Sequence, residues 1–107
     1  MSSLIVPLSM LAGVTRFGTE SAGWTLDAPS SESERTFVGQ VTFERAFVTP
    51  PVVHLGLVGF DISEHDCARL RVRAVDITPE GFSVHVATWF GSRVWSVDVS
   101  WVALGTS

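Results

Sequence analysis

The stretch Pro79–Leu104, PEGFSVHVATWFGSRVWSVDVSWVAL, decides the fold because two alternating runs follow each other within it. In the first run the two faces hold Phe82, Val84 and Val86 on one side and Ser83, His85 and Trp89 on the other. In the second run the two faces hold Trp95, Val97, Val99, Trp101 and Ala103 on one side and Val94, Ser96, Asp98, Ser100 and Val102 on the other. This period of two is typical of half-buried β-strands. With Gly91 and Ser92 as the turn, the stretch predicts a β-hairpin, with Trp89, Phe90, Arg93 and Trp95 gathered at its turn end.

The rest of the chain is predicted as short strands separated by turns, with no helical period. The expected strands are Thr15–Phe17, Thr36–Phe43, Val52–Phe60 and Arg69–Ile77. The continuous apolar character of Val52–Phe60 indicates a central strand buried on both faces. Polar composition predicts loops at Asp27–Glu34 and Asp61–Asp66, and Pro79–Gly81 is expected to turn into the last two strands. The fold class is therefore all-β, an antiparallel sandwich.

Composition limits the chain to one domain and excludes some partners. It has 107 residues, 46% of them hydrophobic, and a formal net charge of −4. All seven basic residues are arginine, which reflects either codon bias or a need for planar, multidentate donors. Because nucleic acids are held by an excess of basic residues, we expect no nucleic-acid binding.

The N-terminal residues and the single cysteine bear on the cellular compartment in which the chain folds. Cys67 is alone, so no intramolecular disulfide forms, and folding in the cytoplasm is expected. The apolar start of the chain has no basic residue before Leu4, contains Pro7 and is too short to span a bilayer. We expect neither signal peptide nor membrane insertion. Residues 1–11 are predicted as an extended arm over a sheet edge or a neighbouring subunit, and residues 12–107 as the domain.

Spacing of the titratable residues does not indicate catalysis or a metal site. His54, His65 and His85 lie on three segments without a zinc spacing. The acidic residues Asp61, Glu64 and Asp66 lack the EF-hand spacing, and no nucleophile elbow is present. We therefore expect no metal, no cofactor and no enzymatic activity.

A set of short motifs in a fixed order resembles the H-type lectin domain, the family of invertebrate agglutinins and of the C-terminal domain of discoidin. The motifs are Ala22-Gly23-Trp24, Val41-Thr42-Phe43, Phe47, Pro50-Pro51-Val52-Val53, Asp61, Arg69, Ile77-Thr78-Pro79, Gly81-Phe82, Thr88-Trp89, Trp95 and Ser100-Trp101. The resemblance implies a six-stranded antiparallel β-sandwich that assembles as trimers or paired trimers. It also implies binding of galactose or N-acetylgalactosamine in clefts between protomers.

The resemblance assigns site residues one by one. Arg69 stands where the family has a sugar-binding arginine, and Trp89 matches the tryptophan of its Thr-Trp pair. Trp95 replaces a family aromatic that is commonly tyrosine, and Phe90 stands where the agglutinin has histidine. The family's Gly-x-Asp clasp falls in the Ser30–Arg35 loop, where the substitutes implied are Glu32 or Glu34.

Sugar binding is also expected from the residue types, since pyranose C–H faces pack on aromatic rings and hydroxyls need charged partners. Trp89 and Trp95 are expected either to bind a ligand or to lie in an interface, and two hypotheses on the function of the chain remain open. In the first, the chain binds glycans or cell-surface polysaccharide, as in cell adhesion, at the boundaries of a homo-oligomer. In the second, it is a structural adaptor or spike base in a phage-like particle with other particle proteins. Trp24 and Trp101 are predicted as core residues, and Arg71 and Arg73 as interface residues.

Overall fold

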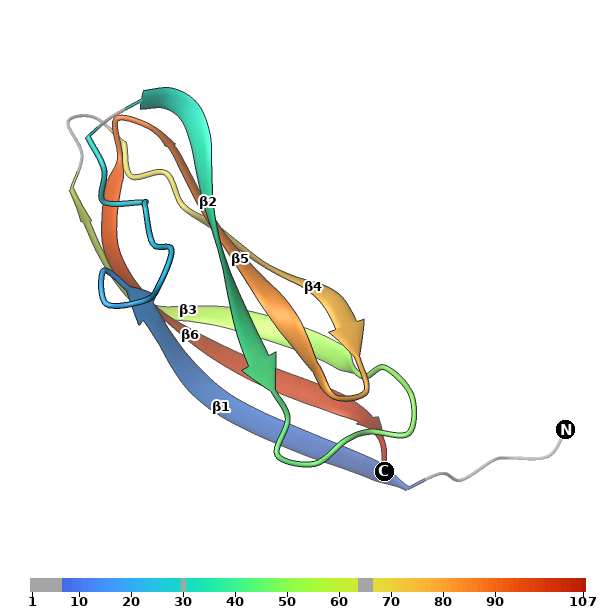
Figure 1. The fold of residues 1–107 in the computed structure, drawn as a ribbon. Helices are drawn as coiled ribbons and strands as arrows, with labels where there is room; N and C mark the ends of the chain where they lie inside the picture. Colours follow the sequence, from blue (N-terminus) through green and yellow to red (C-terminus); the bar gives the residue numbers. More distant parts are fainter. Residues whose placement is uncertain (1–6, 30, 64–66) are drawn as a thin grey trace, which may run out of the picture.

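The computed structural model describes residues 7–29, 31–63 and 67–107, with the backbone alone at 31 and 32. Its strands are β1 (Leu8–Gly18), β2 (Ser31–Thr42), β3 (Val52–Ser63), β4 (Arg71–Thr78), β5 (Gly81–Phe90) and β6 (Arg93–Thr106). They form two three-stranded antiparallel sheets, in the orders β1-β6-β3 and β2-β5-β4, which pack face to face (Figure 1). The expected six-stranded antiparallel sandwich is confirmed.

The core lies between the sheets and is built mainly by the two central strands. Strand β5 contributes Val84 and Val86, and β6 contributes Val97 and Val99, all with almost no exposed surface. At one end Trp101 packs on Phe43 and Phe82, with ring centroids 5.7 and 5.8 Å apart. At the other end the ring of Trp24 lies 5.0 Å from Phe37, and its Nε1 donates to the Val94 carbonyl. The expected core roles of Trp24 and Trp101 are therefore confirmed.

The predicted hairpin of the last two strands is wrong. Strand β5 is the centre of one sheet and β6 is the centre of the other, so Gly91 and Ser92 cross between the layers. The alternation identified the buried faces correctly, because Val84 and Val97 both point into the core. The apolar faces of two strands are buried whether the strands pair in one sheet or face each other across the core. Alternation therefore does not decide which strands pair. The hairpin that forms is β4–β5, through Pro79 and Glu80.

Strand β3 is an edge strand, which corrects the prediction of a central strand buried on both faces. It pairs with β6 alone. Its inward residues Val53, Leu55 and Ile62 pack against the core, whereas Val52, Val58 and Phe60 are well exposed. Its unbroken apolar sequence therefore reflects an apolar outer surface as well as a buried one. A bulge at Val58, between Leu57 and Gly59, shifts the register with β6.

Several predicted boundaries also change. Strand β1 begins at Leu8, well before the expected Thr15 and within the range of the predicted arm. Strand β2 begins at Ser31, inside the predicted 27–34 loop. The acidic loop predicted at 61–66 is shortened because β3 extends to Ser63, and residues 64–66 lie outside the described part. Over residues 7–29, 31–63 and 67–107 no helix has the length and apolarity needed to cross a membrane.

Candidate functional site

The sequence-predicted site residues lie at the end of the sandwich where β2 starts and where β5 connects to β6 (Figure 1). Three guanidinium groups are placed over three aromatic rings there. The Cζ atom of Arg69 is 5.0 Å from the Phe90 ring centroid, that of Arg71 is 5.4 Å from Trp89, and that of Arg93 is 5.0 Å from Trp95. Each separation lies within the range of a cation–π contact.

Trp89 occupies the outer face of the β2-β5-β4 sheet, because the alternate residues Val86 and Thr88 of β5 are directed inward and buried. Arg71 comes to it from the first position of the neighbouring strand β4. The Arg71 guanidinium is also hydrogen-bonded and ion-paired to Glu34 of β2. The outer face of the sheet thus presents a carboxylate, an indole and a guanidinium together.

Phe90 is the last residue of β5 and has a left-handed backbone, with a φ of 55°. Among the non-glycine residues of the described chain, only Asp76 shares this conformation. It is unfavourable for a side chain with a Cβ, and such strain persists where surrounding contacts fix it. The residue is 48% exposed, and its ring lies beneath the Arg69 guanidinium. A large apolar ring is therefore presented to solvent at the crossover between the sheets.

Trp95 is displaced from the regular pattern of β6 by a bulge. Ser96 pairs with Asp61, and Val94 pairs with Ile62, so Trp95 is the extra residue. Val94 consequently points into the core and has no exposed surface, which corrects the face predicted for it. Bulges commonly re-aim side chains beside functional sites. Arg93, whose Nε donates to the Asp27 carbonyl at 2.8 Å, lies over the Trp95 ring.

Two fully buried hydroxyls hold the backbone of Arg69 from both sides. The Ser92 Oγ accepts the Arg69 N–H at 3.0 Å and donates to the Cys67 carbonyl at 2.9 Å. The Thr88 Oγ1 donates to the Arg69 carbonyl at 2.6 Å. Because Thr88 and Ser92 flank Trp89 and Phe90 in sequence, the segment before β4 is fixed to the β5–β6 connection. The relative positions of Arg69 and the two rings are thereby set by buried hydrogen bonds.

The structure brings most of the predicted residues to one end of the molecule, but in pairings that the sequence did not indicate. Arg69 contacts Phe90, and the two tryptophans have other arginine partners. Glu34 reaches the site through Arg71, whereas the Glu32 side chain lies outside the described residues. The sequence had placed Arg93 near these rings, and the structure sets it over Trp95. Sequence reasoning missed Arg71 as a ring partner, because we had expected it at an interface. The strand period places Arg71 on an outer face but does not identify its neighbour.

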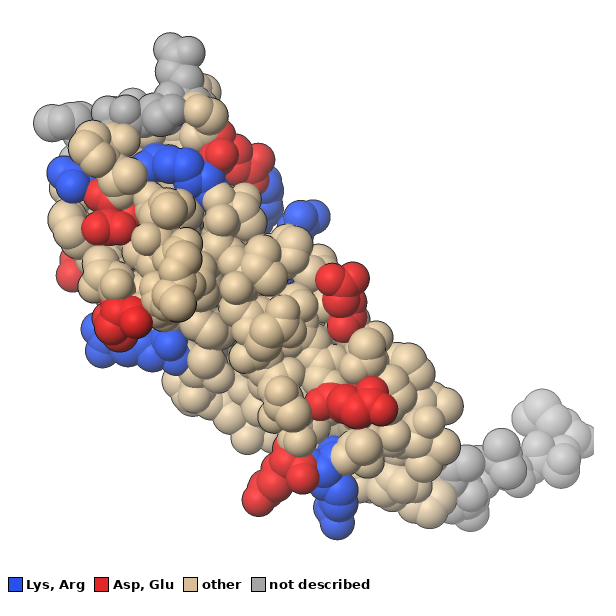
Figure 2. All heavy atoms as spheres, viewed as in Figure 1, with Lys and Arg blue, Asp and Glu red and all other residues tan. Residues whose placement is uncertain are grey.

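The chemistry of this end is that of a shallow polar and aromatic surface. Basic and acidic side chains intermix at the upper left of Figure 2, while uncharged residues cover most of the middle of that face. Guanidinium groups donate hydrogen bonds in a plane, and ring faces offer apolar area beside them. His54 and His85 lie in different sheets, and no group of three potential metal ligands gathers in the described ranges.

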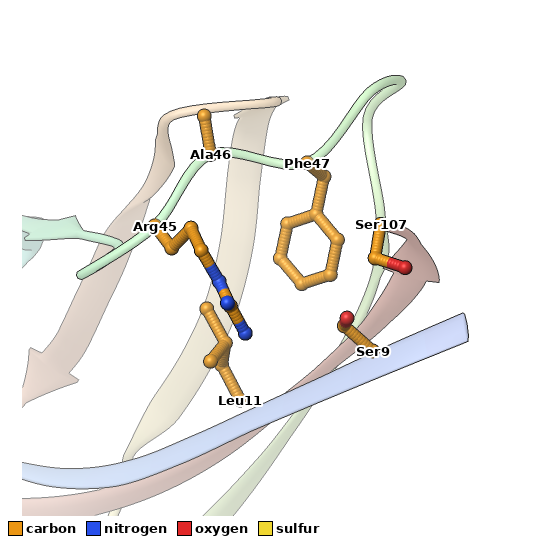
Figure 3. A pocket seen from close by; sticks show the side chains of 6 residues that line it. All are labelled: Ser9, Leu11, Arg45, Ala46, Phe47 and Ser107. Atoms are coloured by element: carbon orange, nitrogen blue, oxygen red, sulfur yellow. The ribbon is translucent and has the colours of Figure 1, made fainter. Parts of the chain in front are cut away.

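A separate hollow of about 270 Å³ lies near the C-terminus, where β2 connects to β3. Its lining residues are Ser9, Leu11, Arg45, Ala46, Phe47 and Ser107 (Figure 3). The Arg45 side chain extends over Leu11, and the Phe47 ring lies between it and the two serines. None of the three arginine–aromatic pairs contributes to this hollow. Arg45 therefore offers an exposed arginine against which the candidate site can be compared.

Comparison with known proteins identifies the family. The sequence model of the H-type lectin domain matches residues 38–104, from the middle of β2 to β6. The chain belongs to the H-type lectin domain family. All three arginine–aromatic pairs of this H-type lectin domain fall within the matched range.

Two relatives extend the comparison. A protein of Fuscovulum blasticum described as "ATP synthase subunits region ORF 7" is 32% identical over 83 residues, which are 78% of this chain and 68% of that protein. Two structures of discoidin II from Dictyostelium discoideum superpose with a TM-score of 0.78 at 24% identity. The match covers 94% of this H-type lectin domain but only 38% of the discoidin II chain. The latter similarity establishes the shared fold.

Proposed function

We propose that this H-type lectin domain binds a sugar of the galactose or N-acetylgalactosamine type, or a cell-surface polysaccharide, through the end that carries the three arginine–aromatic pairs. The observation that carries the proposal is the partly exposed set of rings at Trp89, Phe90 and Trp95, each beside a guanidinium. A pyranose presents an apolar C–H face and a rim of hydroxyls. Ring and guanidinium side by side match those two parts.

The proposed site is completed by a neighbouring copy of the chain. The outer face of the β1-β6-β3 sheet supports assembly, because the apolar side chains exposed on it are Leu8, Met10, Val14, Val52, Val102 and Leu104. Met10, Leu104 and Val52 form one row across all three strands. A contiguous apolar surface of this kind marks an interface in soluble proteins. The proposed assembly is a trimer or a pair of trimers, in which several weak sites gain avidity by engaging one glycan surface together.

The same apolar face favours a second candidate function. As a structural adaptor or spike base of a phage-like particle, the domain would use the β1-β6-β3 face to dock on other particle proteins. In that case it folds in the cytoplasm and is displayed on the particle, and the arginine–aromatic end serves assembly. The first function requires that the domain binds free sugar, and the second does not.

The deciding experiment is a glycan array followed by calorimetric titration of the best sugar. We expect Arg69→Ala and Trp89→Ala each to lower the affinity about tenfold, since an aromatic or charged contact of this kind contributes on the order of 1–2 kcal/mol. Arg45→Ala, at the separate hollow, is the matched control and should bind as the wild type. Binding that survives both site substitutions would place the sugar elsewhere. No binding to any glycan, with a stable oligomer, would favour the adaptor.

A further inference from the structure

Arg35 ties together the two chain segments that frame the arginine–aromatic end. It lies in β2 opposite Thr88 of β5, on the same face of the strand as the buried Phe37. Its Nη1 donates to the Ala28 carbonyl at 3.1 Å, and its Nη2 donates to the Phe90 and Ser92 carbonyls at 3.2 and 2.8 Å. A planar fork of donors suits this set of diverging acceptors better than a single ammonium would.

Two of the three carbonyls that Arg35 holds belong to the strained crossover between β5 and β6. Phe90 has the left-handed φ of 55°, and Ser92 follows it by two residues. Such a conformation is retained only where its surroundings fix it. Arg35 binds both sides of Gly91, which lies in open space, since a Cβ at this position would meet no atom within 4 Å. The Arg35 guanidinium thus directly restrains the backbone that carries the exposed ring of Phe90.

The restraint extends to Arg69 through Ser92. The Ser92 carbonyl accepts from Arg35, and the Ser92 hydroxyl accepts the backbone N–H of Arg69. A shift of the crossover would therefore move Phe90 and Arg69 together. We therefore expect the 5.0 Å separation between the Arg69 Cζ atom and the Phe90 ring centroid to depend on this connected set of hydrogen bonds.

One donor of Arg35 indicates that stability alone does not account for the residue. Its Nε is buried and has no hydrogen-bond partner among the described residues. A buried donor without a partner opposes folding, so this guanidinium contributes less to stability than its three carbonyl contacts suggest. The residue is better explained by the geometry that it enforces on the crossover.

We propose that Arg35 is a positioning residue, which holds the left-handed Phe90 and the Ser92–Arg69 connection in the arrangement that displays the Arg69–Phe90 pair. Its consequence for sugar binding rests on the function proposed above. The restraint of the crossover by Arg35 does not rest on that function, because it can be measured in the protein without ligand. Arg35 precedes the range that the family model matches, so the assignment comes from this structure alone.

The test replaces Arg35 with methionine, which keeps length and apolar bulk but removes every donor. Amide hydrogen exchange and the NMR shifts of Phe90 report on the crossover. We expect the Arg69 amide to exchange about tenfold faster, the factor that corresponds to roughly one net hydrogen bond, while core amides of Val97 and Val99 are unchanged. Arg45→Met is the matched control. Arg35→Lys keeps the charge without the planar fork and should give a smaller change; it carries the test if the methionine variant fails to fold.

Sugar titration of the same variants separates the two levels of the proposal. A loosened crossover with sugar affinity reduced about tenfold supports the whole proposal. A loosened crossover with wild-type affinity overturns the role in binding. Unchanged Phe90 shifts and Arg69 exchange overturn the positioning role itself. If the wild-type protein binds no sugar, the proposed function fails, and the exchange result still decides whether Arg35 positions the pair.

Discussion

The Arg71 guanidinium lies 5.4 Å from the centroid of the Trp89 ring, on the outer face of the β2-β5-β4 sheet. The two residues come from neighbouring strands, and Glu34 from the third strand binds the same guanidinium. Each partner restricts the other, because the carboxylate fixes the guanidinium and the guanidinium covers part of the indole. The sheet therefore presents a preorganised set of polar and aromatic side chains at one end.

Glu34→Gln tests how far this arrangement depends on the ion pair between Glu34 and Arg71. Both side chains are about half exposed, at 47% for Arg71 and 48% for Glu34, so the pair contributes little to stability. We expect the free energy of unfolding to change by less than about 1 kcal/mol. Sugar affinity should fall about threefold, a change of roughly 0.6 kcal/mol, because Arg71 loses the partner that orients it over Trp89. Tryptophan fluorescence measures both quantities, the free energy of unfolding in a denaturant titration and the affinity in a sugar titration. A change in the free energy of unfolding well above about 1 kcal/mol would contradict the interpretation that the exposed ion pair contributes little to stability.

Leu104→Glu tests the apolar outer face of the β1-β6-β3 sheet. Leu104 is exposed and lies between Met10 and Val52 in the row across three strands. A carboxylate placed there is desolvated by any partner, so we expect the oligomer to dissociate to monomers at micromolar concentration. Light scattering coupled to size-exclusion chromatography measures the mass.

Val38→Glu is the control for that substitution, since Val38 is an exposed apolar residue on the other sheet, with 48% of its surface accessible. It should leave the mass unchanged. A wild-type protein that is monomeric in this concentration range would contradict the proposed interface directly.

The sequence determined the composition of the core but not the pairing of its strands. Alternation placed Phe82, Val84, Val97 and Val99 on buried faces, and the structure agrees. The hairpin prediction failed because a two-residue connection serves a crossover between sheets as well as a turn within one. The central position predicted for β3 failed because exposed Val52 and Phe60 gave it the apolar sequence of a buried strand.

The candidate site was predicted as a collection of residues, with Arg93 near Trp95, but the contacts of Arg69 with Phe90 and of Arg71 with Trp89 were not predicted. The family resemblance pointed to Arg69, Trp89, Phe90 and Trp95. The bulge at Trp95 and the left-handed Phe90 determine which arginine each ring meets, and both are backbone features that depend on tertiary contacts. Arg35 acts through carbonyl groups, which every residue possesses, so the sequence carried no sign of its partners.

Gly39→Ala tests the close packing between the sheets. Gly39 lies in β2 opposite Val84, and a Cβ at this position would collide with the ring of Phe17 from β1. Overpacking of this kind costs about 1–3 kcal/mol. Gly91→Ala is the control because a Cβ there meets no atom within 4 Å. Urea denaturation should show a clear loss of stability for the first variant and almost none for the second. Equal stabilities would mean that Phe17 moves aside without strain.

Thr88→Val tests the hydroxyl that holds Arg69. Thr88 is fully buried, and its Oγ1 donates to the Arg69 carbonyl at 2.6 Å. Valine keeps the shape but removes the donor, which leaves that carbonyl without this bond and costs about 1–3 kcal/mol. Thr36→Val, on the exposed face of β2, is the control and should change stability by less than about 0.5 kcal/mol.

Measurement of sugar binding distinguishes a local effect of the Thr88 hydroxyl on the site from a general effect on the stability of the fold. If the hydroxyl serves the site, Thr88→Val weakens sugar binding at a temperature where the protein remains fully folded, because the Arg69 backbone is released on one side while Ser92 still holds the other. The affinity should then fall by less than in Arg69→Ala, which removes the guanidinium itself. Calorimetric titration well below the unfolding midpoint measures the difference. Wild-type affinity in the folded valine variant would mean that Ser92 alone positions Arg69.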